Sequence, residues 1–491
     1  MRAYLDILIV GSGARIFGLA SQFVVLVILS RFLTKAEFGD LMTAFGFYRL
    51  SGVALGVGGS LVLLFHVSRH RDDHEMEIRL QRFSTLAGAI PAAAIALAAV
   101  FAAEPIAAAL GKPSLAMWLR DLAPFLVFST LLVIATGALE GRSRVAESIF
   151  LSEVVPNALR IVLLVPVFLL KLPDAFVAHV LTLSVLLPWL FLARRMWNPA
   201  VRGWQRWSRW DYNYCGKFVA ATLFANQLGA ADLVIASLLF SSATVADYAI
   251  AARLAALFTF FELALLKRFA PRAGRLLHLK DNAGLQREFD TCRRLTIGCV
   301  ALTTGGVLLL APVLLPLLGN YMSARSLLIW LAIASFVTSF YATSDRLLII
   351  AGQANVALVV TASSFAVLIA GPFGIAPWLG PAAIPAAMIV SAVLFRPIVA
   401  LRARQLVGVL TIGWLDRVLM ACGCIALGCA AVAGSYASAA LACAMLGAIG
   451  AYYVATALSL AAGDDYGNSL IFAAGGSPPK PARLLPDKAS Q

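Results

Sequence analysis

Three arginines interrupt apolar stretches of this chain far from any polar segment. Arg15 lies about ten residues into the first apolar run, roughly 15 Å along a helix, and Arg49 and Arg253 lie at comparable depths in later runs. An arginine at mid-bilayer costs about 2.5–3.5 kcal/mol on insertion scales, and such residues usually face an interior cavity. The guanidinium fork matches phosphate oxygens, so three of them in one cavity would suit a phosphorylated ligand. Alternatively, each arginine neutralises a nearby carboxylate or caps a helix.

A second set of polar residues shares helical faces inside other apolar runs. Glu153, Asn157 and Arg160 follow one another at spacings of four and three, so they lie on one face of a helix. That face must look inward, where it either contacts a substrate or joins neighbouring helices. The remaining candidates are Asn226, Gln227, Asp232 and Glu262. They suit hydrogen bonds to a polar ligand or ion coupling, and contacts between helices are the alternative.

The composition is that of a membrane protein. Of 491 residues, 61% are hydrophobic and 13% are charged, and the mean hydropathy is +0.87. Soluble proteins have about 45–50% apolar and about 25% charged residues. The net charge of +14 does not indicate nucleic-acid binding, because the basic residues occupy short loops between apolar runs. The sequence therefore predicts an all-α polytopic membrane protein with no nucleic-acid partner.

Several patterns could suggest a cofactor, metal or disulfide but favour none of them. Gly11-Ser12-Gly13 lacks the third glycine of a dinucleotide loop, and no strand precedes it. His66, His70 and His74 are spaced by four, but acidic and basic neighbours indicate a solvated helix end. The seven cysteines lie in or beside apolar segments, where packing is the expected role. We predict no cofactor and no metal site.

Apolar runs of about 20 residues predict about fourteen transmembrane helices. They begin near Leu5, Leu41, Phe83, Asp121, Ile149, Ala175, Phe218, Val245, Leu295, Leu327, Ala357, Ala382, Val418 and Ala437. Cytoplasmic loops carry an excess of Lys and Arg. Here the even-numbered loops and both termini carry it, so both termini should be cytoplasmic. The short odd, outward-facing loops hold only Arg31, Lys35, Lys112, Arg120, Lys171 and Arg325. The loop from Lys267 to Arg294 reads as an amphipathic helix on the inner leaflet.

The two halves of the chain contain weakly similar segments in the same order. The segment 33–41 matches 240–248, Glu104-Pro105-Ile106 matches Ala311-Pro312-Val313, and 141–146 matches 352–357. An even number of helices per copy gives both copies one orientation, a parallel repeat. We therefore expect two six-helix bundles around a central cavity, at 1–200 and 201–405, and two additional helices at 406–465. The remaining residues, 466–491, read as a disordered cytoplasmic tail.

These repeated segments resemble the multidrug/oligosaccharidyl-lipid/polysaccharide (MOP) exporter superfamily, in its polysaccharide-transporter or O-antigen flippase (Wzx-like) branch. The segment 30–39, Ser-Arg-Phe-Leu-Thr-Lys-Ala-Glu-Phe-Gly, is similar to the turn after the first helix of that superfamily. Asn226-Gln227 and Asp232, followed by the segment 246–254, are similar to its turn into helix 8, with Ala246 where glycine is usual. The segment 141–146 is the third similarity.

The resemblance implies a function and assigns roles to the arginines. Arg15, Arg49 and Arg253 match the cavity arginines of that superfamily's lipid II flippase by helix and depth, which implies that they bind a pyrophosphate. The expected function is translocation of a polyprenyl-pyrophosphate-linked oligosaccharide across the bacterial inner membrane for surface polysaccharide or lipopolysaccharide assembly. Expected partners are this substrate, membrane lipids, and a polymerase or export machinery. The alternatives are a MATE-like drug/cation antiporter and a membrane glycosyltransferase or O-antigen ligase, which would need a larger external loop.

Overall fold

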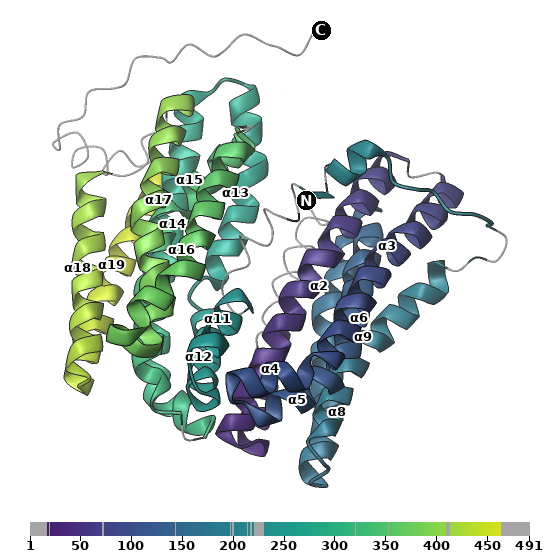
Figure 1. Ribbon diagram of the computed structural model, residues 1–491. Helices are drawn as coiled ribbons and strands as arrows, with labels where there is room; N and C mark the ends of the chain where they lie inside the picture. Colours follow the sequence, from purple (N-terminus) through teal and green to yellow (C-terminus); the bar gives the residue numbers. More distant parts are fainter. Residues whose placement is uncertain are drawn as a thin grey trace. The chain divides into compact units, whose positions relative to one another are not determined.

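The structure is a computed structural model in which all described secondary structure is helical (Figure 1). It describes residues 17–18, 20–70, 73–142, 144–196, 198, 201–213, 215–216, 219, 230–319, 321–351, 353–408 and 413–462. The chain divides into two compact units, which are Met1–Ile250 with Leu317–Asn320 and Ala251–Pro316 with Tyr321–Gln491. The bundle boundaries expected after residues 200 and 405 stay predictions. The expected tail at 466–491 lies outside the described residues.

Unit 1 is built around one central helix. After the apolar helix Ala20–Phe32, its elements are α2 (Lys35–Arg69), α3 (His74–Phe101), α4 (Ala103–Leu110), α5 (Pro113–Asp121), α6 (Ala123–Gly141), α7 (Val145–Ile149), the π-helix η1 (Phe150–Val154), α8 (Val155–Leu169), α9 (Ala175–Met196), α11 (Asp232–Leu239) and most of α12 (Ser242–Ala255). Helix α6 packs against α2, α3 and α9, and α8 packs against α9.

Unit 2 has a similar pattern of packing. Its elements are α13 (Phe260–His278), α14 (Asn282–Leu317), α15 (Ala324–Ile350), α16 (Ala354–Leu379), the short 3-10 helix η3 (Gly380–Ala382), α17 (Ala383–Val407), α18 (Trp414–Ala433) and α19 (Tyr436–Ala462). Helix α15 packs against α13, α17 and α18, α16 packs against α17, and α18 packs against α19.

The protein is a multi-pass membrane protein. Ten helical segments in the described part of the chain are long and apolar enough to cross a bilayer, or eleven if the bent pair α12 and α13 is one span. One of the ten, Asn355–Gln405, has 51 residues, which is roughly 75 Å of helix against a bilayer core of about 30 Å. This segment is therefore long enough to cross twice. Its two parts, α16 and α17, pack against each other, as two neighbouring spans would. The first and seventh expected spans lie mostly outside the described residues. The expected number of fourteen transmembrane helices therefore stays a prediction.

The signature segment around Thr34 starts α2. The Glu37 amide donates to Thr34 Oγ1 at 3.3 Å, and the Thr34 amide donates to Glu37 Oε2 at 2.9 Å. This reciprocal capping box satisfies two of the amide groups that a helix start leaves without partners. Glycines then allow α2 and α6 to pack closely, since a Cβ at Gly137 would lie 2.3 Å from the Ser60 carbonyl oxygen. These glycines therefore serve packing.

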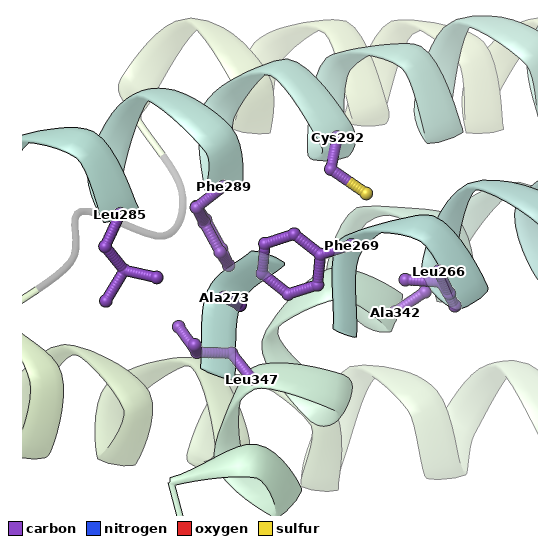
Figure 2. Close-up of a cluster of buried hydrophobic side chains, with 8 residues drawn as sticks. All are labelled: Leu266, Phe269, Ala273, Leu285, Phe289, Cys292, Ala342 and Leu347. Atoms are coloured by element: carbon purple, nitrogen blue, oxygen red, sulfur yellow. The ribbon is translucent and has the colours of Figure 1, made fainter. Parts of the chain in front are cut away.

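The basic loop between Lys267 and Arg294 is a helical hairpin, so the expected helix on the membrane surface is wrong. Its apolar residues pack together between α13, α14 and α15 (Figure 2). Leu285 and Phe289 are completely buried, with Phe269 and Leu347 in the same cluster. The apolar face that was expected to lie in the leaflet is covered by protein instead.

The segment 201–213 packs on the ends of α2 and α3. Trp207 Nε1 donates to Ser84 Oγ at 3.0 Å, and His66 Nε2 lies 2.8 Å from Asp211 Oδ1. The expected solvated histidine face is therefore wrong for His66, whose side chain is mostly covered. Trp204 in this segment is exposed.

Candidate functional site

Arg49 lies in the middle of α2, roughly 20 Å along the helix from Lys35. Its side chain is exposed, although its helical neighbours Tyr48 and Gly52 are buried. In the described part of the chain, Arg49 makes no hydrogen bond and no close ion pair. Asp232 attracts it electrostatically from a longer distance. A guanidinium at mid-membrane depth without a close countercharge is suited to bind an anion.

Asp232 is held by residues close to it in the sequence. It begins α11 and is completely buried, and its Oδ2 atom accepts a hydrogen bond from the Tyr248 hydroxyl at 2.9 Å. Its Oδ1 atom accepts the amide of Leu233 at 2.8 Å. These donors orient the carboxylate and stabilise its negative charge. Asp232 therefore contributes a fixed negative charge near Arg49 without pairing with it.

The expected polar face at Glu153, Asn157 and Arg160 surrounds a π-helical turn. Glu153 lies in η1, and its backbone carbonyl accepts a hydrogen bond from Asn157 Nδ2 at 2.7 Å. Arg160 Nη1 donates to Asn157 Oδ1 at 3.2 Å, and Arg160 Nε donates to Ser184 Oγ on α9 at 3.0 Å. Such π-turns are frequent at functional sites. Arg160 is thus oriented by its own helix and by α9.

Arg49 and Arg160 repel each other within unit 1. Their positive charges interact electrostatically, although α2 and α8 are separated by several elements in sequence. The guanidinium of Arg160 also lies 6.0 Å from the ring centroid of Phe45, one turn before Arg49. Two like charges that interact at membrane depth are unfavourable unless an anion lies close to both. The arrangement is therefore suited to a doubly charged or larger anion.

Unit 2 contains a separate charged group that sequence reasoning missed. Arg396 lies inside α17, where it forms an ion pair with Asp345 of α15. Glu262, in the first turn of α13, is in electrostatic contact with Arg396. In the described part of the chain, the buried Oε2 atom of Glu262 has no hydrogen-bond partner. Apolar residues on both sides of Arg396, such as Leu394 and Ile398, were the signal for its membrane depth.

The remaining expected site residues lie in α12 or outside the described residues. Arg253 is half-buried in α12 and belongs to unit 2, so a role together with Arg49 stays a prediction. Arg15, Asn226 and Gln227 lie outside the described residues. Of the predicted set, the structure brings Arg49, Arg160 and Asp232 into one electrostatic group.

Comparison with known proteins agrees with the sequence signatures. The family described as "Polysaccharide biosynthesis protein" matches residues 28–261. No curated protein matches the chain.

Solved structures of MOP-superfamily transporters share the fold at low sequence identity. The lipid II flippase MurJ in an inward closed conformation has a TM-score of 0.66 at 13% identity, covering 95% of this chain and 100% of that chain. An inward-facing MATE family multidrug resistance transporter has a TM-score of 0.67 at 16% identity, covering 78% and 94%. A MOP superfamily transporter from Pyrococcus furiosus has a TM-score of 0.60 at 16% identity, covering 82% and 95%. Residues 28–261 of the chain thus match a polysaccharide biosynthesis protein family, and the chain has the fold of MOP-superfamily transporters.

Proposed function

We propose that this protein is a flippase that carries a polyprenyl-pyrophosphate-linked oligosaccharide from the inner to the outer leaflet of the bacterial inner membrane. The product would be used for O-antigen, exopolysaccharide or capsule assembly, and a polymerase or export machinery would act next. The family description supports the link to polysaccharide biosynthesis. The likeness to the lipid II flippase along 95% of the chain supports the fold that such transport needs.

The observation that carries the proposal is the Arg49–Arg160 pair. Each guanidinium can bind phosphate oxygens through several donors, and their mutual repulsion falls when an anion binds near both. Asp232 limits the positive charge, so the site can also release the pyrophosphate. Arg253 and Arg15 would extend the anion site. Glu153, Asn157, Asn226 and Gln227 would contact sugars, and Glu262 with Arg396 would take part in ion coupling.

Alternating access of two parallel bundles would move the head group while the polyprenyl tail stays in the bilayer. The packing within the two halves supports two copies. Helix α6 contacts α9 as α15 contacts α17, and α8 contacts α9 as α16 contacts α17. With both termini cytoplasmic, a membrane potential of about 100 mV, negative inside, favours outward movement of two negative charges by roughly 4–5 kcal/mol.

The leaflet distribution of the lipid-linked oligosaccharide tests this function. An impermeant probe for the glycan should detect it outside in cells with the protein and not in cells without it. Arg49→Ala should abolish the external signal, and Arg49→Lys should restore only part of it, because lysine keeps the charge but loses the fork. Arg272→Ala, at an exposed cytoplasmic arginine paired with Glu288, is the matched control.

Other results would select another function. Unchanged sidedness with normal surface polysaccharide would refute the flippase and favour a drug/cation antiporter, for which the arginine pair is a poor match. Normal flipping with unligated glycan outside would favour a glycosyltransferase or ligase. Full activity of both Arg49→Ala and Arg160→Ala would refute the pyrophosphate site but not the flippase function.

A further inference from the structure

Polar contacts outside the proposed substrate site join the outer end of α2 and its neighbours to α11, α12 and the end of α14. Lys35 Nζ lies 2.7 Å from Asp247 Oδ1 of α12, and Lys112 Nζ donates to the Ser237 carbonyl of α11 at 2.7 Å. Arg31 Nε donates to the Leu317 carbonyl at the end of α14 at 2.8 Å. All these residues belong to unit 1. The predicted topology places this end outside the cell.

The backbones of α2 and α12 also touch at this end. A Cβ at Gly39 would lie 1.8 Å from the Ser242 carbonyl oxygen and 3.2 Å from the Ala246 amide nitrogen. A helix–helix approach this close leaves no space for a polar head group to pass. The outer ends of the two helices are therefore closed in this structure.

Two aspartates at equivalent repeat positions have different kinds of partner. Asp40 and Asp247 are each the sixth residue of their helix and are both buried. Asp40 accepts a hydrogen bond from Ser114 and is in electrostatic contact with Lys112, both from its own half. Those contacts persist when the two predicted bundles separate. Asp247 pairs with Lys35 of the other predicted bundle, so separation of the bundles breaks that contact.

The pairing with Asp247 also explains why Lys35, a basic residue, lies in a loop that is predicted to be external. Basic residues are rare in the external loops, and most of those present have a partner inside the protein. Arg120 pairs with Glu104, and Arg325 donates to the carbonyls of Gly434 and Ser435. Lys35 is half-exposed and Asp247 is largely covered, so their attraction is less screened than that of a surface pair.

We propose that Lys35 and Asp247 form a reversible ion-pair lock that holds the outer ends of α2 and α12 closed. The lock forms when the chain is closed to the outside and opens when it releases its substrate there. This proposal rests on alternating access in the proposed function, but it does not depend on the identity of the substrate. Its residues differ from the arginines of the substrate site.

A reporter cysteine can detect opening of this end. Ala246 is completely buried beside Gly39, so Ala246→Cys should react slowly with an impermeant maleimide added outside intact cells. Lys35→Ala and Asp247→Ala should each increase the labelling rate about three- to tenfold. The exchange Lys35→Asp with Asp247→Lys should return the rate to within about twofold of the reporter alone. If the reporter chain does not fold, Ala249→Cys, also fully buried in α12, replaces it.

Two controls define the result. The chain with only its native cysteines gives the background, and Lys171→Ala removes an exposed external charge that has no ion pair in the described part of the chain. The lock is refuted if Lys35→Ala labels no faster than Lys171→Ala, or if the exchanged pair labels as fast as the single variants. Labelling needs no substrate. A normal lock in a protein that does not move the lipid-linked oligosaccharide would refute the proposed function and leave the lock standing.

Discussion

Asp416 of α18 accepts a hydrogen bond from the Arg293 guanidinium of α14, with 2.6 Å between Arg293 Nη1 and Asp416 Oδ2. The other carboxylate oxygen of Asp416 accepts the Tyr453 hydroxyl of α19 at 2.7 Å. All three side chains are buried, and they join the two C-terminal helices to α14. A buried pair of this kind is costly to break, because the remaining charge keeps its desolvation penalty.

Asp416→Ala should therefore destabilise the protein by about 3 kcal/mol, since Asp290 lies farther from Arg293, at 3.4 Å. Tyr453→Phe should cost only about 1 kcal/mol, because it removes one hydrogen bond. Unfolding in mixed detergent micelles measures both. Arg287→Ala, at an exposed arginine on α14 that makes no hydrogen bond or ion pair in the described part of the chain, is the control. Equal stability of Asp416→Ala and Arg287→Ala would show that the buried pair does not hold the C-terminal helices.

Gly39→Ala should shift the substrate-free protein toward an open outer end. The added methyl group would overlap the Ser242 carbonyl, and neither backbone can move without separating α2 and α12. Labelling of Ala246→Cys from outside should become at least about tenfold faster. Gly306→Ala on α14, where a Cβ meets nothing within 4 Å, should leave labelling unchanged. Slow labelling in Gly39→Ala would mean that the outer end tolerates the methyl group while closed.

Asp211→Asn should weaken the docking of segment 201–213 at neutral pH. Burial raises the pKa of Asp211, but hydrogen bonds from His66 and Ser208 outweigh it and hold the pKa below its usual value. The carboxylate therefore stabilises the fold fully above about pH 4 and loses this contribution as pH falls through the lowered pKa. We expect a loss of about 1–2 kcal/mol at pH 7.

Thermal unfolding from pH 7 to pH 3 measures this contribution. The difference between the unchanged chain and Asp211→Asn should shrink toward zero at the acidic end. Glu75→Gln, which removes an exposed partner of Arg79, should cost less than about 0.5 kcal/mol throughout. A difference that stays constant down to pH 3 would contradict a role for the Asp211 charge.

The sequence predicts the starts of several helices well, because these depend on local patterns. The capping box at Thr34 and Glu37 explains why α2 begins there, and apolar runs place α16 and α17 close to their expected starts. The spacing of three residues between Asn157 and Arg160 also accounts for the hydrogen bond between their side chains. In each case the cause lies within a few residues of the effect.

Partners from distant segments could not be predicted in the same way. The sequence spacing of Leu285 and Phe289 is the same whether lipid or Phe269 covers their side chains. Only the folding of α13 against α14 shows that protein covers them. Likewise, Arg396 could be matched to Asp345 only after α15 and α17 were known to pack together. The spacing of apolar residues along a helix indicates that one face is covered, but it does not indicate which segment covers that face.

Arg49→Gln should have opposite effects on the free and the bound protein. In the free protein it removes the cost of a charge at membrane depth and the repulsion from Arg160, which together exceed the lost attraction to Asp232, so stability should increase by about 1 kcal/mol. In the presence of a polyprenyl pyrophosphate, the unchanged chain should gain stability through binding, whereas Arg49→Gln should gain little. Sites that bind charged ligands commonly trade stability for function in this way.

Thermal unfolding in detergent, with and without undecaprenyl pyrophosphate, separates these effects. Arg160→Gln should gain less in the free protein than Arg49→Gln, because it also loses hydrogen bonds to Asn157 and Ser184. The neutral polyprenol controls for binding of the tail alone. If Arg49→Gln lowers the stability of the free protein and keeps the full stabilisation by the pyrophosphate, Arg49 is a structural residue and the anion binds elsewhere.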